Sequence, residues 1–162
     1  MSPERDRPLH GNEPEVRLLG FTLVELLISL AIMGTLAGMA TISYKKFIHE
    51  TRGNVAMTEL KNISVHLELY RQEQGEYPES LDDLGLGQFL DPWGNPYQYQ
   101  ALDKVPKGMW RKDHFLVPLN NHYDLWSMGP DGRTAPPLTS KLSRDDIIRA
   151  TDGGYIGPAS QY

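Results

Sequence analysis

The chain of 162 residues contains no cysteine. This absence excludes disulfide frameworks, cysteine-ligated zinc, iron–sulfur clusters and thiol nucleophiles. Basic side chains are also scarce: 16 Lys and Arg stand against 21 Asp and Glu, a formal net charge of −5. Because proteins that bind nucleic acid need clustered basic side chains to neutralise phosphates, we expect no nucleic-acid partner.

Sequence motifs of enzyme active sites are missing or incomplete. His49 and Glu50 begin the H-E-x-x-H pattern of a zinc protease, but Gly53 stands where the second histidine is required. Ser43 and Lys46 have the S-x-x-K spacing, but neither S-D-N nor K-T-G occurs in the chain. No G-x-S-x-G motif is present either. We therefore expect that the chain is not an enzyme.

A long apolar run occupies residues 21–42, where Glu25 is the one charged side chain. A bilayer core of roughly 30 Å needs about 20 such residues in a helix. The run is longer than the apolar region of a secretory signal peptide, and no small-residue cleavage motif follows it. We expect a single membrane-spanning helical segment over residues 21–43.

The helical pattern continues past the apolar run. Residues 44–74 contain no proline and one glycine. Apolar side chains recur there at steps of three to five residues, as on one face of an amphipathic helix: Val55, Leu60, Ile63, Leu67 and Tyr70. Gly75 and Pro78 are typical of a helix end. We expect one long helix over residues 21–74.

Turn residues dominate the sequence after Gly75. Three short runs rich in aromatic and β-branched residues lie between the turns, at residues 96–100, 114–118 and 123–127. They predict a small antiparallel sheet that covers the amphipathic face of the helix, which is an α+β fold. We interpret Trp93 and Trp126 as anchors of the core between helix and sheet. Residues 134–162 show no clear period and are expected to form an ordered loop.

The motif GFTLVE, which contains Gly20, Phe21 and Glu25, opens the apolar run. It resembles the N-terminal signature of the type IV pilin and type II secretion pseudopilin superfamily. The resemblance implies that residues 1–20 are a leader, which a prepilin peptidase removes by cutting after Gly20. It also implies that the same peptidase methylates the new N-terminal Phe21.

Two further motifs, DPWGNPY at residues 91–97 and YDLWSMGPDG at residues 123–132, resemble the paired motifs of the major pseudopilin. The resemblance implies a pilin-like fold, with one long N-terminal helix on a small antiparallel sheet and a C-terminal loop. Residues 44–162 are then a periplasmic head on a single-pass anchor in the inner membrane.

The same resemblance implies a structural subunit that forms a homopolymer, the periplasmic pseudopilus of a type II protein secretion system. The implied partners are the prepilin peptidase, the inner-membrane secretion platform and minor pseudopilins. A type IV pilin or minor pilin is the alternative within the superfamily, although many type IV pilins close the C-terminal loop with a disulfide. A signal-anchored envelope enzyme or sugar-binding protein is the alternative from a different class.

Glu25 is a carboxylate inside an apolar helix, which costs about 2.5–3.5 kcal/mol on insertion scales. Cleavage after Gly20 creates a positively charged amine on Phe21. In a staggered stack of identical helices, one subunit's Glu25 neutralises its neighbour's amine, so we interpret Glu25 as an assembly residue. The alternative is a carboxylate that reaches the lipid headgroups from the helix end.

Three aspartates gather near the C-terminus: Asp131, Asp145 and Asp146. Calcium prefers about 6–8 oxygen ligands from carboxylates and backbone carbonyls. The resemblance to the major pseudopilin implies a calcium ion bound by these carboxylates and by the backbone carbonyls of Leu125 and Ser127. The alternative is that Asp145 or Asp146 caps a short helix. The loop at residues 133–144 is longer than is usual in that family.

Overall fold

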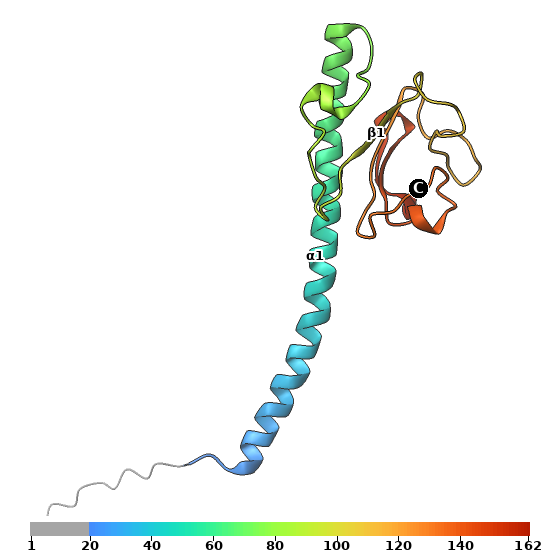
Figure 1. The fold of residues 1–162 in the computed structure, drawn as a ribbon. Coiled ribbons are helices and arrows are strands. Elements are labelled where there is room, and N and C mark those ends of the chain that lie inside the picture. Colours follow the sequence, from blue (N-terminus) through green and yellow to red (C-terminus); the bar gives the residue numbers. More distant parts are fainter. Residues whose placement is uncertain (1–19) are drawn as a thin grey trace, which may run out of the picture. The chain divides into compact units, whose positions relative to one another are not determined.

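The computed structural model describes residues 20–162, with residue 42 described by its backbone alone. The predicted leader, apart from Gly20, lies outside the described residues. The first element, α1 (Leu23–Gln74), is the predicted long helix, which begins at Leu23 rather than at Phe21. The chain divides into two compact units, one ending at Ile42 and the other Ser43–Tyr162, and α1 contributes to both (Figure 1).

The first unit exposes apolar side chains on all sides of its helix. Between Leu23 and Met39, every leucine, isoleucine, valine and methionine side chain is more than half exposed. Among the described residues, α1 is the one helix long and apolar enough to cross a membrane. A helix that is apolar all round is stable where lipid or other helices cover it. Length and composition therefore agree with the predicted membrane-spanning segment.

In the second unit, α1 buries a single stripe of side chains against the sheet. Four residues at helical steps are at most 2% exposed: Ala56, Leu60, Ile63 and Leu67. They share one hydrophobic core with Tyr123, Leu125 and Ile147. The helix ends at Gln74, and the next residue, Gly75, has a left-handed φ of +85° and donates its N–H to the carbonyl of Arg71 at 2.8 Å.

Four antiparallel strands form an open sheet in the order β1-β2-β3-β4. The strands are β1 (Gln98–Ala101), β2 (Tyr123–Ser127), β3 (Ile147–Ala150) and β4 (Tyr155–Pro158). Short 3₁₀ helices lie in the connections: η1 (Leu81–Leu84), η2 (Lys141–Ser143), η3 (Thr151–Gly153) and η4 (Ala159–Gln161). Each strand pairs with the next along the chain. One long helix packed on this antiparallel sheet confirms the predicted α+β, pilin-like fold class.

The predicted strand at residues 114–118 is wrong. Oδ1 of Asp113 accepts hydrogen bonds from the backbone N–H groups of Phe115, at 2.7 Å, and Val117, at 2.8 Å. Leu116 between them has a left-handed φ of +63°. A side chain that bonds to the backbone two and four residues ahead favours a turn over an extended strand.

The expectation of an ordered loop without strands over residues 134–162 is also wrong, because β3 and β4 lie there. All four residues of β3 are buried, so the strand lacks the alternation of apolar and polar residues that marks a half-exposed strand. Since Asp145 and Asp146 precede a strand, neither caps a helix.

The sheet carries an apolar core on each face. The first core, described above, faces α1, and Trp93 packs against it as predicted. Trp126 belongs instead to the second core, so its predicted place between helix and sheet is wrong. The second core contains Leu119, Trp126, Leu138, Ile148, Ala150 and Ala159.

Candidate functional site

The predicted cleavage site lies directly before α1. Gly20 is exposed, and the side chain of Phe21 is 81% exposed. Neither residue belongs to a helix or strand. Both are therefore accessible in this chain, and cleavage between them stays a prediction.

Glu25 forms a capping box with Thr22 at the start of α1. Its Oε2 accepts hydrogen bonds from the backbone N–H of Thr22, at 2.8 Å, and from the Thr22 hydroxyl, at 2.9 Å. The N–H of Glu25 donates back to the Thr22 hydroxyl at 3.2 Å. The sequence pattern T-x-x-E signals this arrangement, and the sequence analysis missed it. Glu25 thus helps to cap the start of the helix, and its pairing with a neighbouring amine stays a prediction.

The two motifs of the head contact each other through Asp91, which is 4% exposed. Its Oδ1 accepts from the N–H groups of Trp93, at 3.0 Å, and Asn95, at 2.9 Å. Its Oδ2 accepts from the hydroxyl of Ser127 in β2 at 2.5 Å. The Asn95 side chain donates to the carbonyl of Gly129 at 2.8 Å. Residues from the first motif therefore fix the turn that follows β2.

Two of the predicted calcium ligands, Asp131 and Asp145, lie together on the surface. The N–H of Asp131 donates to Oδ2 of Asp145 at 3.2 Å, and Oδ1 of Asp131 accepts from the N–H of Arg133 at 2.8 Å. Leu125 and Ser127, the predicted carbonyl ligands, are buried inside β2. The structure therefore brings the backbone of Asp131 to the carboxylate of Asp145, while the Asp131 carboxylate bonds within its own turn.

Asp146, the third predicted carboxylate, binds a cation that belongs to the protein. Its side chain is fully buried, and Oδ2 accepts from Nη2 of Arg111 at 2.6 Å and from the hydroxyl of Thr134 at 2.7 Å. Burial raises the pKa of Asp146, against the opposing effect of Arg111 and Thr134. Burial likewise lowers the pKa of Arg111, against the opposing effect of Asp146. No local sequence pattern marks Arg111 as the partner of Asp146.

The predicted set, as arranged, does not fit a calcium ion that uses Asp146. Within residues 20–162, no three acidic or histidine side chains come together in a way that could hold a metal. Asp131 and Asp145 supply two carboxylates, whereas calcium takes about 6–8 oxygens. Calcium binding by this chain stays a prediction.

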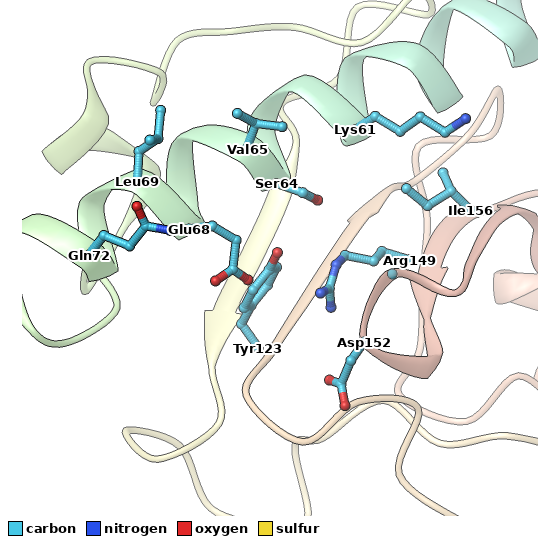
Figure 2. Close-up of a pocket in the computed structure, with 11 residues that line it drawn as sticks. Lys61, Ser64, Val65, Glu68, Leu69, Gln72, Tyr123, Arg149, Asp152 and Ile156 are labelled. Carbon is cyan, nitrogen blue, oxygen red and sulfur yellow. The ribbon is translucent and has the colours of Figure 1, made fainter.

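A hollow of about 510 Å³ lies between α1 and residues of β3 and β4 (Figure 2). In its lining, the Cζ atom of Arg149 lies 4.1 Å from the ring centre of Tyr123. Neither Nε of Arg149 nor the Tyr123 hydroxyl has a hydrogen-bond partner among the described residues. The hydroxyl of Ser64 on the helix side donates to the carbonyl of Leu60 at 2.8 Å. The Ser64 hydroxyl is therefore bonded to the backbone of its own helix.

Two family models match the chain. The model of type II secretion system (T2SS), protein G, matches residues 45–141, more than half of the chain, and the prokaryotic N-terminal methylation motif matches residues 19–41.

Individual relatives agree with the family models. The chain is 28% identical to the type II secretion system core protein G of Escherichia coli (strain K12), over 70% of this chain and 82% of that protein. It is also 28% identical to the core protein G of Pseudomonas aeruginosa, over 70% and 84% of the two chains. It is 33% identical to the type IV major pilin of Myxococcus xanthus, over 51% of this chain and 36% of the pilin. No solved structure matches.

Proposed function

Because the chain belongs to the type II secretion system protein G family, we propose that it works as the repeating structural subunit of a pseudopilus. One observation carries this proposal: a single chain joins a methylation motif and an exposed apolar helix to a head that matches protein G. The subunit's task is structural and not catalytic. Buried polar side chains of the head, such as Asp91 and Asp146, are engaged in contacts that hold loops together.

The subunit forms a homopolymer through the first unit of α1. The apolar side chains of this unit are exposed on every side, so they are covered by lipid before assembly and by the helices of other copies within the fibre. The prepilin peptidase releases Phe21 as the mature N-terminus. The inner membrane then holds the helix, the head faces the periplasm, and the secretion platform and minor pseudopilins complete the assembly.

Glu25 sets the register of this polymer. Thr22 uses only Oε2 of the carboxylate, and Oε1 makes no hydrogen bond among the described residues. Oε1 is therefore available to the methylated amine of a neighbouring subunit, which it neutralises in a medium where an unpaired charge is unfavourable.

One variant separates the charge of Glu25 from its capping role. Glu25→Gln keeps the capping box, because glutamine serves at this position as well, but it removes the negative charge. We expect Glu25→Gln to remain in the membrane and to lose fibre formation when the secretion genes are co-expressed. Ser29→Ala, one turn further along the helix, is the control and should form fibres normally. Normal fibres from Glu25→Gln would contradict the pairing, and absence of fibres from the unmodified chain would contradict the polymer itself.

A type IV pilin is the second candidate, favoured by the similarity to the Myxococcus xanthus pilin. The two functions differ in what is lost when the gene is deleted. A pseudopilin deletion stops the release of secreted proteins and leaves surface pili intact. The loss of surface pili with unchanged secretion would favour the pilin.

A further inference from the structure

The C-terminal part of the head needs a contact that holds its long connection in place. Between β2 and β3 the chain runs through residues 128–146, with one short 3₁₀ helix and no strand. Ordering a connection of this length costs conformational entropy, which contacts must offset. A disulfide is excluded, because the chain has no cysteine.

Arg111 reaches this connection from a different loop, the one between β1 and β2, and is only 2% exposed. Its Nη2 donates to Asp146, its Nη1 donates to the Thr134 hydroxyl, and that hydroxyl donates to the same Asp146 oxygen. Its Cζ lies 4.8 Å from the ring centre of Trp126, and its backbone N–H donates to Oδ2 of Asp124 at 2.8 Å. Arg111 thus joins both loops to β2, through its side chain and its backbone.

The backbone beside Arg111 supports the same connection. The N–H of Lys112 donates to the carbonyl of Pro136 at 3.1 Å, and the N–H of Leu138 donates to the carbonyl of Lys112 at 2.9 Å. The carbonyl of Arg111 accepts from the N–H of Leu119 at 3.0 Å. The guanidinium therefore projects from backbone that is held on both sides, which positions it for the carboxylate.

We propose that the Arg111 guanidinium is the cation that closes the C-terminal part of the head, at the carboxylate for which the family resemblance predicts calcium. It follows that the head keeps its stability without calcium. Oδ1 of Asp146 is buried and has no hydrogen-bond partner among the described residues, so it is the oxygen left for a divalent ion. An ion there would lie beside the guanidinium that occupies Oδ2, and like charges repel strongly in a buried setting.

The buried ion pair predicts a specific pattern in a double-mutant cycle. Removing one partner leaves an uncompensated buried group, whereas removing both is tolerated better. We expect Arg111→Met and Asp146→Asn each to lower the melting temperature of the full chain, in detergent micelles, by about 10 °C. The melting temperature of the double variant should fall by less than the sum of the decreases in the two single variants. Additive losses, or no loss from either single variant, would overturn the proposal.

Calcium provides the second readout. We expect the unmodified full chain to melt within about 1 °C of the same temperature in a chelator and in millimolar calcium, as a ligand that does not bind leaves stability unchanged. Asp145→Asn, at the neighbouring predicted ligand, is the matched control for Asp146→Asn and should leave the melting temperature nearly unchanged.

A calcium-dependent rise of several degrees, lost equally in Asp145→Asn and Asp146→Asn, would overturn the proposal in favour of a calcium site that includes both aspartates. Calcium is titrated against the unmodified chain, so this measurement is possible even if a variant does not fold. Should Arg111→Met fail to fold, Arg111→Lys replaces it: the lysine keeps the charge without the two-pronged hydrogen bonding. We expect its melting temperature to lie below that of the unmodified chain and to stay independent of calcium.

Discussion

Among the single residues of the head, Asp91 joins a turn to strand β2 by hydrogen bonds. It is one buried carboxylate with three donors: two backbone N–H groups of its own turn and the hydroxyl of Ser127, 36 positions along the chain. Hydrogen bonds to an ionised acceptor are stronger than those between neutral groups. The turn and the strand are therefore held by the same charge.

Replacing Asp91 by asparagine tests this role. Asp91→Asn removes the charge, and its amide nitrogen faces either two backbone N–H groups that cannot accept or the Ser127 hydroxyl, which then no longer donates to residue 91. We therefore expect the free energy of unfolding to fall by about 2–3 kcal/mol. Asp103→Asn is the control, because Asp103 is exposed and should change stability by less than about 0.5 kcal/mol. Chemical denaturation followed by tryptophan fluorescence measures both. Equal effects from the two variants would contradict a special role for Asp91.

Sequence reasoning identified the N-terminal methylation motif because its signal is local. The GFTLVE motif and the apolar run after it lie within one continuous stretch that contains Glu25. The partner of Asp146 is Arg111, 35 positions away, and no local pattern connects them. A cluster of aspartates therefore indicated a cation, but the sequence alone did not show that the protein provides that cation itself.

At the scale of elements, the second half of α1 depends on its buried stripe. Leu60 is fully buried, whereas Leu69 on the same helix is 48% exposed. We expect Leu60→Ala to reduce the free energy of unfolding by about 2–5 kcal/mol, through lost apolar burial and the cavity left behind. Leu69→Ala, the identical change at an exposed site, should cost less than about 1 kcal/mol. Denaturant midpoints of the two variants compare them directly, and similar losses would contradict the assigned helix face.

The elements differed in how well their sequences predicted them. The 3.6-residue period, the absence of proline and the terminal Gly75 predicted α1 to its last residue. Residues 114–118 have the composition of a strand, but the hydrogen bonds from Asp113 fold them into a turn. β3 is covered on both faces by the rest of the head, so its burial comes from tertiary contacts that a short sequence window does not contain.

The stability of the whole head is sensitive to alkaline pH because several of its tyrosines are buried. Burial raises the pKa of Tyr123 to about 12, and burial also raises the pKa values of Tyr97 and Tyr99. For Tyr97, the hydrogen bond to Glu59 adds to the shift.

Because an unfolded tyrosine ionises near pH 10, the unfolded state loses its protons first as the pH rises. The stabilisation from these groups is complete below about pH 10 and is lost as the pH rises through the folded pKa values. We expect the denaturant midpoint to decline steadily above pH 10, and Tyr97→Phe to reduce the slope. A midpoint that stays constant to pH 11.5 would contradict the burial of these hydroxyl groups.

The whole molecule, as we propose, is processed and assembled as a pseudopilin. Processing changes the mass of the chain, which can be measured on protein isolated from membranes of a host with an active prepilin peptidase. We expect a chain that begins at Phe21 with a methylated amine, and a full-length chain when the peptidase is inactivated. A chain that keeps its first 20 residues in the presence of active peptidase would rule out this processing and favour a simple membrane anchor.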